Sequence, residues 1–305
     1  MAVLNSKTIK NKIKSVRNTK KITKTMEMIA ATKMRKSVGA VINTKLYSKI
    51  ALNLLSRLSK IDPNVNPFLL NRETKRVLII LMTSNRGLCG SFNTNILKVA
   101  ENKFNTMYKG KDIDVSVIGI GKRSAKFAKR NGLDLVAIFD DINDTPRFDN
   151  ARIVSKMIID GYIEGKYDQV DLIYTEFISS LTQICREIKL LPLTADMVEP
   201  IDSEDDEFSQ DYIDQELDIN NYIFEPDVTM VIDYVIPKLI EIQIYQALLE
   251  SSASEHSARM IAMKNANESA GEMIRALTLE FNKARQAAIT KEISEITNGA
   301  EALNE

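Results

Sequence analysis

The spacing of apolar side chains changes twice along this chain, from helical to strand-like and back to helical. The first helical stretch carries apolar side chains at Ile9, Ile13, Val16, Ile22, Met26 and Ile29. Their intervals of three, four and six residues drift from a strict heptad, which predicts a long helix that forms a weak coiled coil. Small residues interrupt this stripe and are expected to let another helix or a surrounding wall approach closely: Ala30, Ala31, Gly39 and Ala40.

Proline positions predict that the helix at each end of the chain is long. All seven prolines lie between Pro63 and Pro237, and proline reliably breaks a helix. The first helix should end by Asp62, and the second should begin near Asp227 or Pro237. At about 1.5 Å per residue the proline-free ends would reach roughly 90 and 100 Å, whereas a globule of this length is about 50 Å across. The two helices are therefore predicted to pair antiparallel as a projecting coiled shaft.

Between these helices the apolar runs are short and β-branched. The runs are RVLIILMTS, DVSVIGIG, LDLVAIFD and DQVDLIYTEF, separated by helical segments at 93–108, 122–130 and 149–164. This alternation predicts a Rossmann-like three-layer α/β domain with a mostly parallel sheet. A further run, REIKLLP, is expected to close the sheet as an antiparallel edge strand.

Charge is distributed unevenly, although 41 basic and 41 acidic residues give a formal net charge of zero. Between Lys7 and Lys60 the only acid is Glu27, so the first helix is a basic rod. Between Asp196 and Asp227 acids crowd together without lysine or arginine, which predicts an extended, self-repelling loop. We therefore divide the chain into an N-terminal shaft helix (1–62), an α/β foot domain (74–195), an acidic loop with a foot segment (196–226) and a C-terminal shaft helix (227–305).

Composition predicts a cytoplasmic protein. The sequence has no run of eighteen apolar residues and its first residues lack the apolar core of a secretory signal. Cys89 and Cys185 are too few and too far apart for a disulfide framework, and are expected to be small buried hydrophobic residues in a reducing compartment.

Candidate chemistry is sparse. The turn IGIGKR, with Gly119 and Gly121 between a strand and a helix, resembles a phosphate-binding turn but lacks the third glycine of the dinucleotide fingerprint. A dinucleotide-binding α/β protein with coiled-coil arms is the alternative that this turn leaves open. His256 is the only histidine and is expected at a helix surface, so the sequence does not favour a catalytic triad or a metal site built on histidines. We expect no cofactor, no metal and no catalytic residue.

The basic first helix could also contact nucleic acid. It has no aromatic residue before Tyr47, however, and its lysines lie on all sides. A solvated helix face, or a rod steered into an acidic protein collar, explains the same charge.

Five segments carry a resemblance to a known family. KIKSVRNTKKITKTMEMIAATKMRKS resembles the N-terminal helix of the γ subunit of F-type ATP synthases. Its C-terminal helix is resembled by SASEHSARMIAMKNANESAGEMI and LTLEFNKARQAAITKEISEITNGAEAL. The turn after its first strand is resembled by TSNRGLCGSFN, and the segment before its second long helix by NYIFEPD. The resemblance covers nearly the whole chain, and motifs this long in this order are specific.

The resemblance implies a central rotor without catalytic activity of its own. In that family the shaft stands in a ring of three α and three β subunits, and the foot sits on the membrane c-ring and binds the ε subunit. Ion flow, usually of protons, turns the ring and the shaft, and the shaft drives the β sites through their states. With neither a transit-like start nor the cysteine-bearing insertion of chloroplast members, the implied place is the cytoplasmic face of a bacterial inner membrane.

The resemblance also implies contact residues. Arg285, Gln286 and Thr290 match positions that contact a catch loop of β, and Lys24 and Met26 match positions near the acidic lever segment of β. Two positions of NYIFEPD match contacts to the polar loops of the c-ring: Tyr222 and Glu225. The tip, residues 289–302, is expected to turn inside an apolar sleeve. The acidic stretch before Tyr222 is longer than is usual in bacterial members of that family, so the resemblance does not extend to its contacts, which are expected to be lineage-specific.

Overall fold

The computed structural model describes residues 6–58, 66–142, 146–193 and 228–303. The chain forms two compact units. The α/β unit is Thr32–Ala258, and the helix-pair unit combines Met1–Ala31 with Arg259–Glu305. Two long helices, α1 (Ser6–Leu58) and α6 (Val228–Leu303), each contribute to both units.

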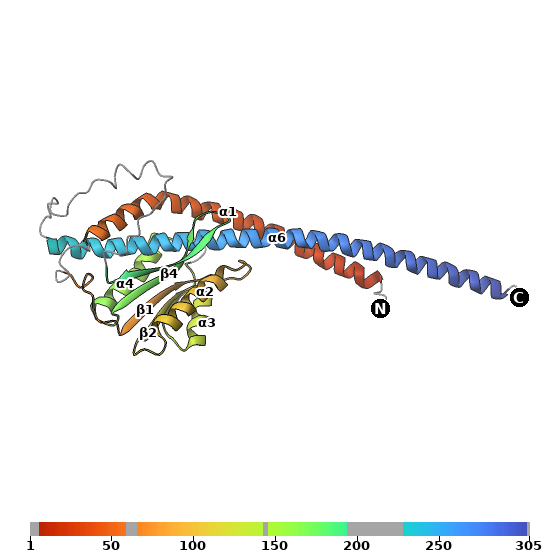
Figure 1. Ribbon diagram of the computed structural model, residues 1–305. Helices are drawn as coiled ribbons and strands as arrows, with labels where there is room; N and C mark the ends of the chain where they lie inside the picture. Colours follow the sequence, from red (N-terminus) through yellow and green to blue (C-terminus); the bar gives the residue numbers. More distant parts are fainter. Residues whose placement is uncertain (1–5, 59–65, 143–145, 194–227, 304–305) are drawn as a thin grey trace. The chain divides into compact units, whose positions relative to one another are not determined.

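The α/β unit contains a five-stranded sheet in the order β3-β2-β1-β4-β5 (Figure 1). The strands are β1 (Arg76–Met82), β2 (Asp114–Ile120), β3 (Asp134–Phe139), β4 (Gln169–Phe177) and β5 (Gln183–Leu191). The first four strands are parallel, and β5 runs antiparallel to β4. The predicted mostly parallel sheet with an antiparallel edge strand is therefore confirmed.

Helices cover both faces of this sheet, so the predicted three layers are confirmed as well. They are α2 (Phe92–Lys103), which continues as the π-helical turn η2 (Phe104–Tyr108), α3 (Lys122–Asn131) and α4 (Phe148–Ile163). Successive side chains of a strand point to opposite faces. Val77, Ile79 and Leu81 of β1 accordingly pack with α2 and α3, whereas Leu78, Ile80 and Met82 pack with α4 and α6.

The first third of α6 forms part of the core of the α/β unit. Six fully or nearly fully buried side chains of this segment belong to the same cluster as β1 and α4: Ile232, Ile236, Leu239, Ile240, Ile244 and Leu248. The helix begins at Val228 and includes Pro237, one of the two arrangements that the sequence allowed. The apolar cluster in this segment thus covers the sheet, a role that its helical spacing alone does not predict.

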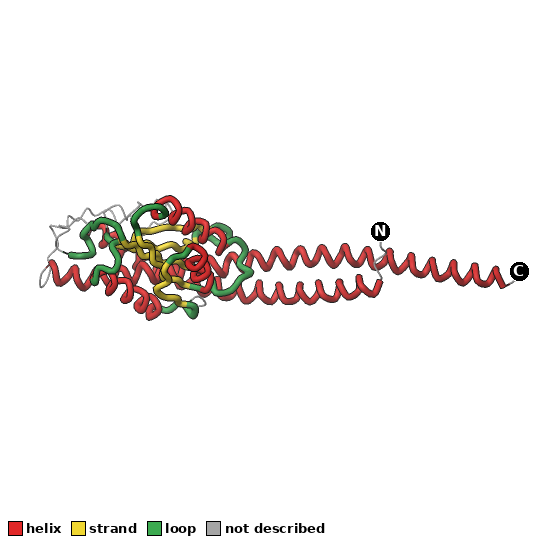
Figure 2. Tube along the Cα trace, turned by 90° about the horizontal axis from the view of Figure 1, so that it is seen from below, coloured by secondary structure: helices red, strands yellow, loops and turns green. Residues whose placement is uncertain are grey.

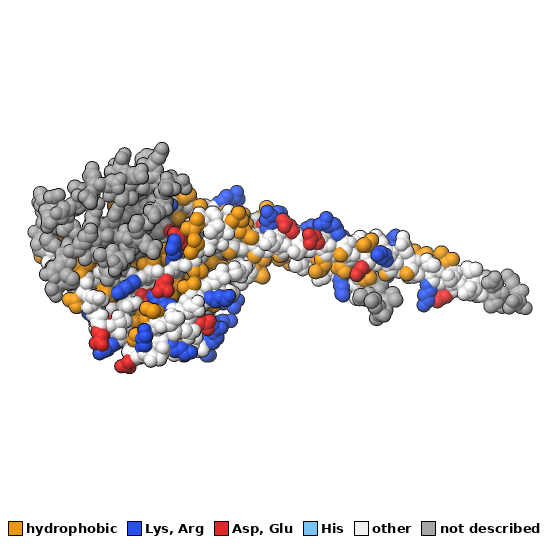
Figure 3. All heavy atoms as spheres, in the orientation of Figure 1, with side chains coloured by type: hydrophobic (Ala, Val, Ile, Leu, Met, Phe, Trp, Pro, Cys, Tyr) orange, Lys and Arg blue, Asp and Glu red, His pale blue; other side chains and the backbone are white. Residues whose placement is uncertain are grey.

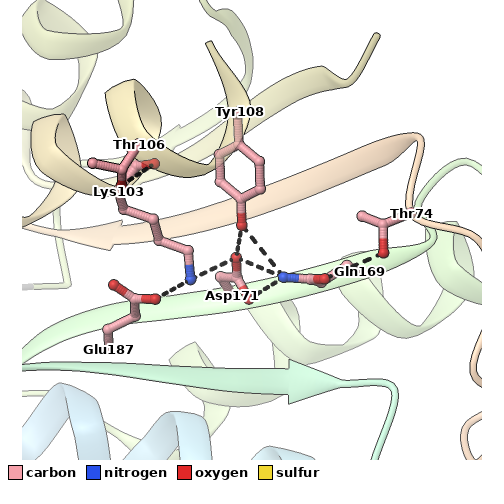
Figure 4. Close-up of polar contacts among 7 residues, drawn as sticks. All are labelled: Thr74, Lys103, Thr106, Tyr108, Gln169, Asp171 and Glu187. Atoms are coloured by element: carbon pink, nitrogen blue, oxygen red, sulfur yellow. Dashed lines mark hydrogen bonds and ion pairs between the residues drawn. The ribbon is translucent and has the colours of Figure 1, made fainter. Parts of the chain in front are cut away.

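A buried polar network fastens α2 and η2 to β4 (Figure 4). Lys103 Nζ lies 2.8 Å from Asp171 Oδ2, and the two side chains are 6% and 0% exposed. Tyr108 donates its hydroxyl hydrogen to Asp171 Oδ2, and Gln169 Nε2 donates to Asp171 Oδ1 at 2.9 Å. Lys103 also contacts Glu187 of β5. Burial and the Asp171 charge raise the pKa of Tyr108 well above its ordinary value, so the phenol stays a donor to this carboxylate.

Candidate partner-binding surfaces

In the helix-pair unit, α1 and α6 lie side by side (Figure 2). The contact buries small and apolar side chains, with Ile9 and Ala30 of α1 and Met263 and Ala270 of α6 each less than a tenth exposed. A Cβ atom at Gly271 would lie 3.1 Å from Lys20 Nζ, so the end of the Lys20 side chain lies over this glycine. Ala30 is buried in this contact, as expected of a small residue that another helix packs against.

Gly39 does not bring α1 close to another helix of this chain among the described residues. Its position on α1 is exposed, and a Cβ atom placed there would meet nothing within 4 Å. The residue is therefore not a point of close approach between helices. Small size permits close packing, but only the small residues on the side of α1 that faces another helix can pack in this way.

A polar groove of about 440 Å³ lies between the two helices of this unit. It is lined by Lys20, Lys24, Glu27, Lys264, Asn267, Glu268, Gly271, Glu272 and Arg275. Four cationic and three anionic side chains share the lining, so the groove has no strong net sign. Figure 3 likewise shows blue and red side chains mixed along this helix pair on the face in view. Such a surface suits reversible polar contact with another protein.

Lys24 and Met26 occupy different environments on α1. Lys24 lines the groove and forms an ion pair with Glu27 (Nζ to Oε1, 3.0 Å), with its own side chain 56% exposed. Met26 is half-buried. A partner segment can therefore reach the ammonium group of Lys24 more easily than the thioether of Met26.

Arg285, Gln286 and Thr290 are all exposed on α6. Thr290 donates its hydroxyl hydrogen to the carbonyl oxygen of Gln286 at 3.0 Å, a bond within the helix. The guanidinium and amide groups remain accessible from solvent. Tyr222, Glu225 and the acidic stretch 196–226 lie outside the residues that the structure describes.

The glycine turn after β2 is filled by the chain's own polar groups. The N–H of Gly121 donates to the Phe139 carbonyl oxygen at 2.8 Å, and the N–H of Lys122 donates to Asn85 Oδ1 at 3.1 Å. The N–H of Ser124 donates to Thr83 Oγ1 at 3.0 Å. A phosphate would need these donors at the start of α3. Their protein partners favour a strand-to-helix turn over a dinucleotide site.

His256 is buried, so its expected place at a helix surface was wrong. The side chain is 1% exposed and lies in a buried serine-rich segment of α6. Ser254 and Ser257 donate to the carbonyl oxygens of Thr175 and Ser180, at 3.3 and 2.7 Å. The sequence signal is the run of small polar residues, which let α6 lie directly against the β4–β5 hairpin.

The two cysteines are free thiols in different surroundings. Cys89 is 2% exposed, as expected of a small buried residue, and Cys185 is half-buried, where burial raises the pKa of its thiol. Among the described residues, no three His, Cys, Asp or Glu side chains meet in a way that could hold a metal ion. Within the same residues, no helix combines the length and the apolar character needed to cross a membrane.

The fold and these surfaces define an α/β protein with two long terminal helices that offer exposed polar and apolar faces. A family model described as ATP synthase matches residues 5–303. The ATP synthase gamma chain of Heliobacterium modesticaldum is 44% identical over 296 residues, covering 97% of this chain and 98% of that one. The gamma chain of Nitrosomonas europaea is 41% identical over 301 residues, covering 98% and 99%. The chain belongs to the ATP synthase gamma chain family.

Solved structures share the fold at lower sequence identity. A chain of the Euglena gracilis mitochondrial ATP synthase, from the OSCP/F1/c-ring structure in rotational state 3, matches with a TM-score of 0.69 and 20% identity. The match covers 98% of this chain and 94% of that one. A chain of the rotor of the same enzyme matches with a TM-score of 0.63 and 18% identity.

Proposed function

We propose that this chain is the non-catalytic rotor of an ATP synthase, coupling ion translocation through a membrane c-ring to ATP synthesis or hydrolysis. The observation that carries the proposal is the match to gamma chains over 97% of the chain, which includes both long helices. Catalysis would take place on the β subunits, within a ring of three α and three β subunits around the shaft. The foot would bind the ε subunit and the c-ring.

Shape supports this role. Two helices of different sequence cannot present the same surface in three directions, so a threefold collar around them would meet three different faces. A rotor changes the state of a site only through differential contact energy with that site's conformations. The mixed charges of the groove and the exposed side chains of α6 supply such differences.

Specific contacts are proposed at the positions that the family resemblance implies. Lys24 and Met26 are proposed to face an acidic segment of β, and Arg285, Gln286 and Thr290 a polar loop of β. Tyr222 and Glu225 are proposed to touch the c-ring. The accessible Lys24 ammonium and Arg285 guanidinium groups support the first two assignments, because both donate charge-assisted hydrogen bonds to acidic partners.

The proposed place is the cytoplasmic face of a bacterial inner membrane, with peripheral attachment through the c-ring. The bacterial gamma chains at 40–44% identity support this setting.

The test is to purify the tagged chain from its native membranes, identify the subunits that accompany it by mass, and measure ATPase activity. We expect α and β in equal amounts, each at three copies per tagged chain, and activity in the complex but not in the isolated chain. A chain that elutes alone, or that hydrolyses ATP by itself, would contradict the proposal.

One substitution tests the assignment of Arg285. Arg285→Ala removes a charged donor that makes no contribution to the buried core, and a hydrogen bond to a charged group contributes about 1.5–3 kcal/mol. We therefore expect ATP hydrolysis by the assembled complex to fall by about ten- to a hundredfold, measured by a coupled assay. Lys283→Ala, two residues away and equally exposed, is the matched control and should leave the rate nearly unchanged. Equal losses from both would show that Arg285 has no special contact.

A further inference from the structure

Within the α/β unit, α6 packs against α1 and the end of β4 (Figure 1). This stretch of α6 carries Glu250, whose side chain is partly buried. Glu250 Oε1 accepts a hydrogen bond from Gln246 Nε2 at 2.7 Å. Glu250 Oε2 is shut off from solvent, and none of the side chains that the structure describes forms a hydrogen bond with it. A buried charge with an unsatisfied oxygen is costly, and taking up a proton removes that charge and so relieves most of the cost.

The groups facing Glu250 come from three other elements. Tyr174 and Glu176 lie on β4, Arg186 lies on β5, and Lys45 lies on α1. Arg186 is held by Glu176, with Nε to Oε2 at 2.7 Å, so most of its charge is already compensated. Burial raises the pKa of Glu250 to about 7, and the Glu176 charge adds to this increase. The Gln246 hydrogen bond, Lys45 and Arg186 oppose it.

The contact with α1 can adapt to either protonation state. Gln246 Oε1 lies 2.7 Å from Thr44 Oγ1 of α1, and Thr44 Oγ1 also lies 2.9 Å from the Ala40 carbonyl oxygen. With Glu250 ionised, Thr44 donates to Gln246, and Gln246 donates to the carboxylate. With Glu250 protonated, the amide of Gln246 can turn over, accept from the carboxyl group and donate to Thr44, which then donates to Ala40.

We propose that Glu250, Gln246 and Thr44 form a proton-sensitive clasp between α6 and α1. Proton uptake by Glu250 reverses the direction of the hydrogen-bond chain and leaves a neutral, closely packed contact. Proton loss leaves a negative charge with one unsatisfied oxygen in the same site, which loosens α6 from α1 and from the β4–β5 hairpin. The clasp lies wholly within the α/β unit and does not depend on the proposed role of the chain as a rotor.

The direction of the pH effect follows from the raised pKa. At pH values between 4.5, the ordinary pKa of a glutamate, and about 7, Glu250 holds a proton in the closed contact and releases it when the segment opens. Protection against opening is therefore greatest below that window, falls as the pH rises through it, and levels off above it.

Hydrogen exchange of the full-length chain, followed by mass spectrometry from pH 5 to 8 and corrected for intrinsic exchange, tests the clasp. Protection of backbone amides in residues 36–48 and 240–258 should fall by about ten- to a hundredfold between pH 5 and 7 and then stay constant. Glu250→Gln keeps the shape without the charge, and should remain protected across the range. Wild-type protection independent of pH, or the same fall in Glu250→Gln, would overturn the proposal.

Two further variants separate this site from its neighbours. Glu176→Gln removes a like charge and releases Arg186, so the midpoint of the fall should move to lower pH. Glu241→Gln changes another buried carboxylate of α6, one paired with Lys238 at 2.9 Å, and should leave the midpoint in place. A midpoint that moves with Glu241→Gln and not with Glu176→Gln would show that the titrating group is not Glu250.

Discussion

A chain that ends at Ala288 is expected to melt within about 2 °C of the full-length chain and yet to fail in the assembled complex. Every side chain from residue 289 to residue 298 is exposed, so its removal takes little apolar area from the fold. Ile289, Ile293 and Ile296 nevertheless share one face of α6 and are 48%, 58% and 71% exposed. A partner that covers them would gain roughly 1.5–3 kcal/mol for each side chain fully buried.

Calorimetry of both chains and the yield of α and β subunits with the tagged chain measure the two effects. We expect an unchanged transition of the α/β unit and a large loss of assembly or of ATP-driven ion pumping. The control variant combines Lys291→Ala with Glu295→Ala, which removes an exposed pair separated by 3.6 Å and keeps the isoleucines. A melting temperature lowered by more than about 5 °C on truncation would contradict this separation of fold from assembly.

Lys103→Met should lower the free energy of unfolding by about 3–5 kcal/mol, the largest loss of stability that we expect from a single substitution. The change removes the cation that lies 2.8 Å from the fully buried Asp171. Tyr108 and Gln169 would still donate to that carboxylate, but its charge would lose its buried counterion. Urea unfolding of the full-length chain, followed by circular dichroism, measures the difference.

Two comparisons show whether burial is the cause. Adding Asp171→Leu to Lys103→Met removes the stranded charge and should recover a large part of the loss. Arg130→Met breaks an exposed pair with Glu101, separated by 3.1 Å, and should cost about 0.5 kcal/mol or less. Equal losses of unfolding free energy from Lys103→Met and Arg130→Met would contradict the structure, in which the Lys103–Asp171 pair is shielded from water.

The local pattern of the sequence was sufficient for the secondary structure and for the sheet. β-Branched runs placed all five strands, and REIKLLP was identified as the antiparallel edge, because period and turn signals are local properties. The role of the first third of α6 was missed. Its apolar residues fit a shaft and a domain core equally well, and only the position of the sheet decides between them.

Polar sites were harder to predict than apolar ones. Lys103 and Asp171 are 68 positions apart, counted from their residue numbers, and no periodicity links them. His256 was misplaced because a lone histidine among serines looks hydrophilic, although small side chains allow a backbone to be buried. The contact residues Arg285 and Gln286 came from family resemblance alone, since an exposed arginine on a helix carries no signal of its partner.

Unbroken helices also have a mechanical consequence. Because α6 is one helix from Val228 to Leu303, it passes from the α/β unit into the helix-pair unit without an intervening loop. A twisting load on either unit is carried by successive i to i−4 hydrogen bonds, and each residue takes up a small share of the angle. A twist of α6 is therefore spread over many residues, because no loop interrupts the helix between Val228 and Leu303.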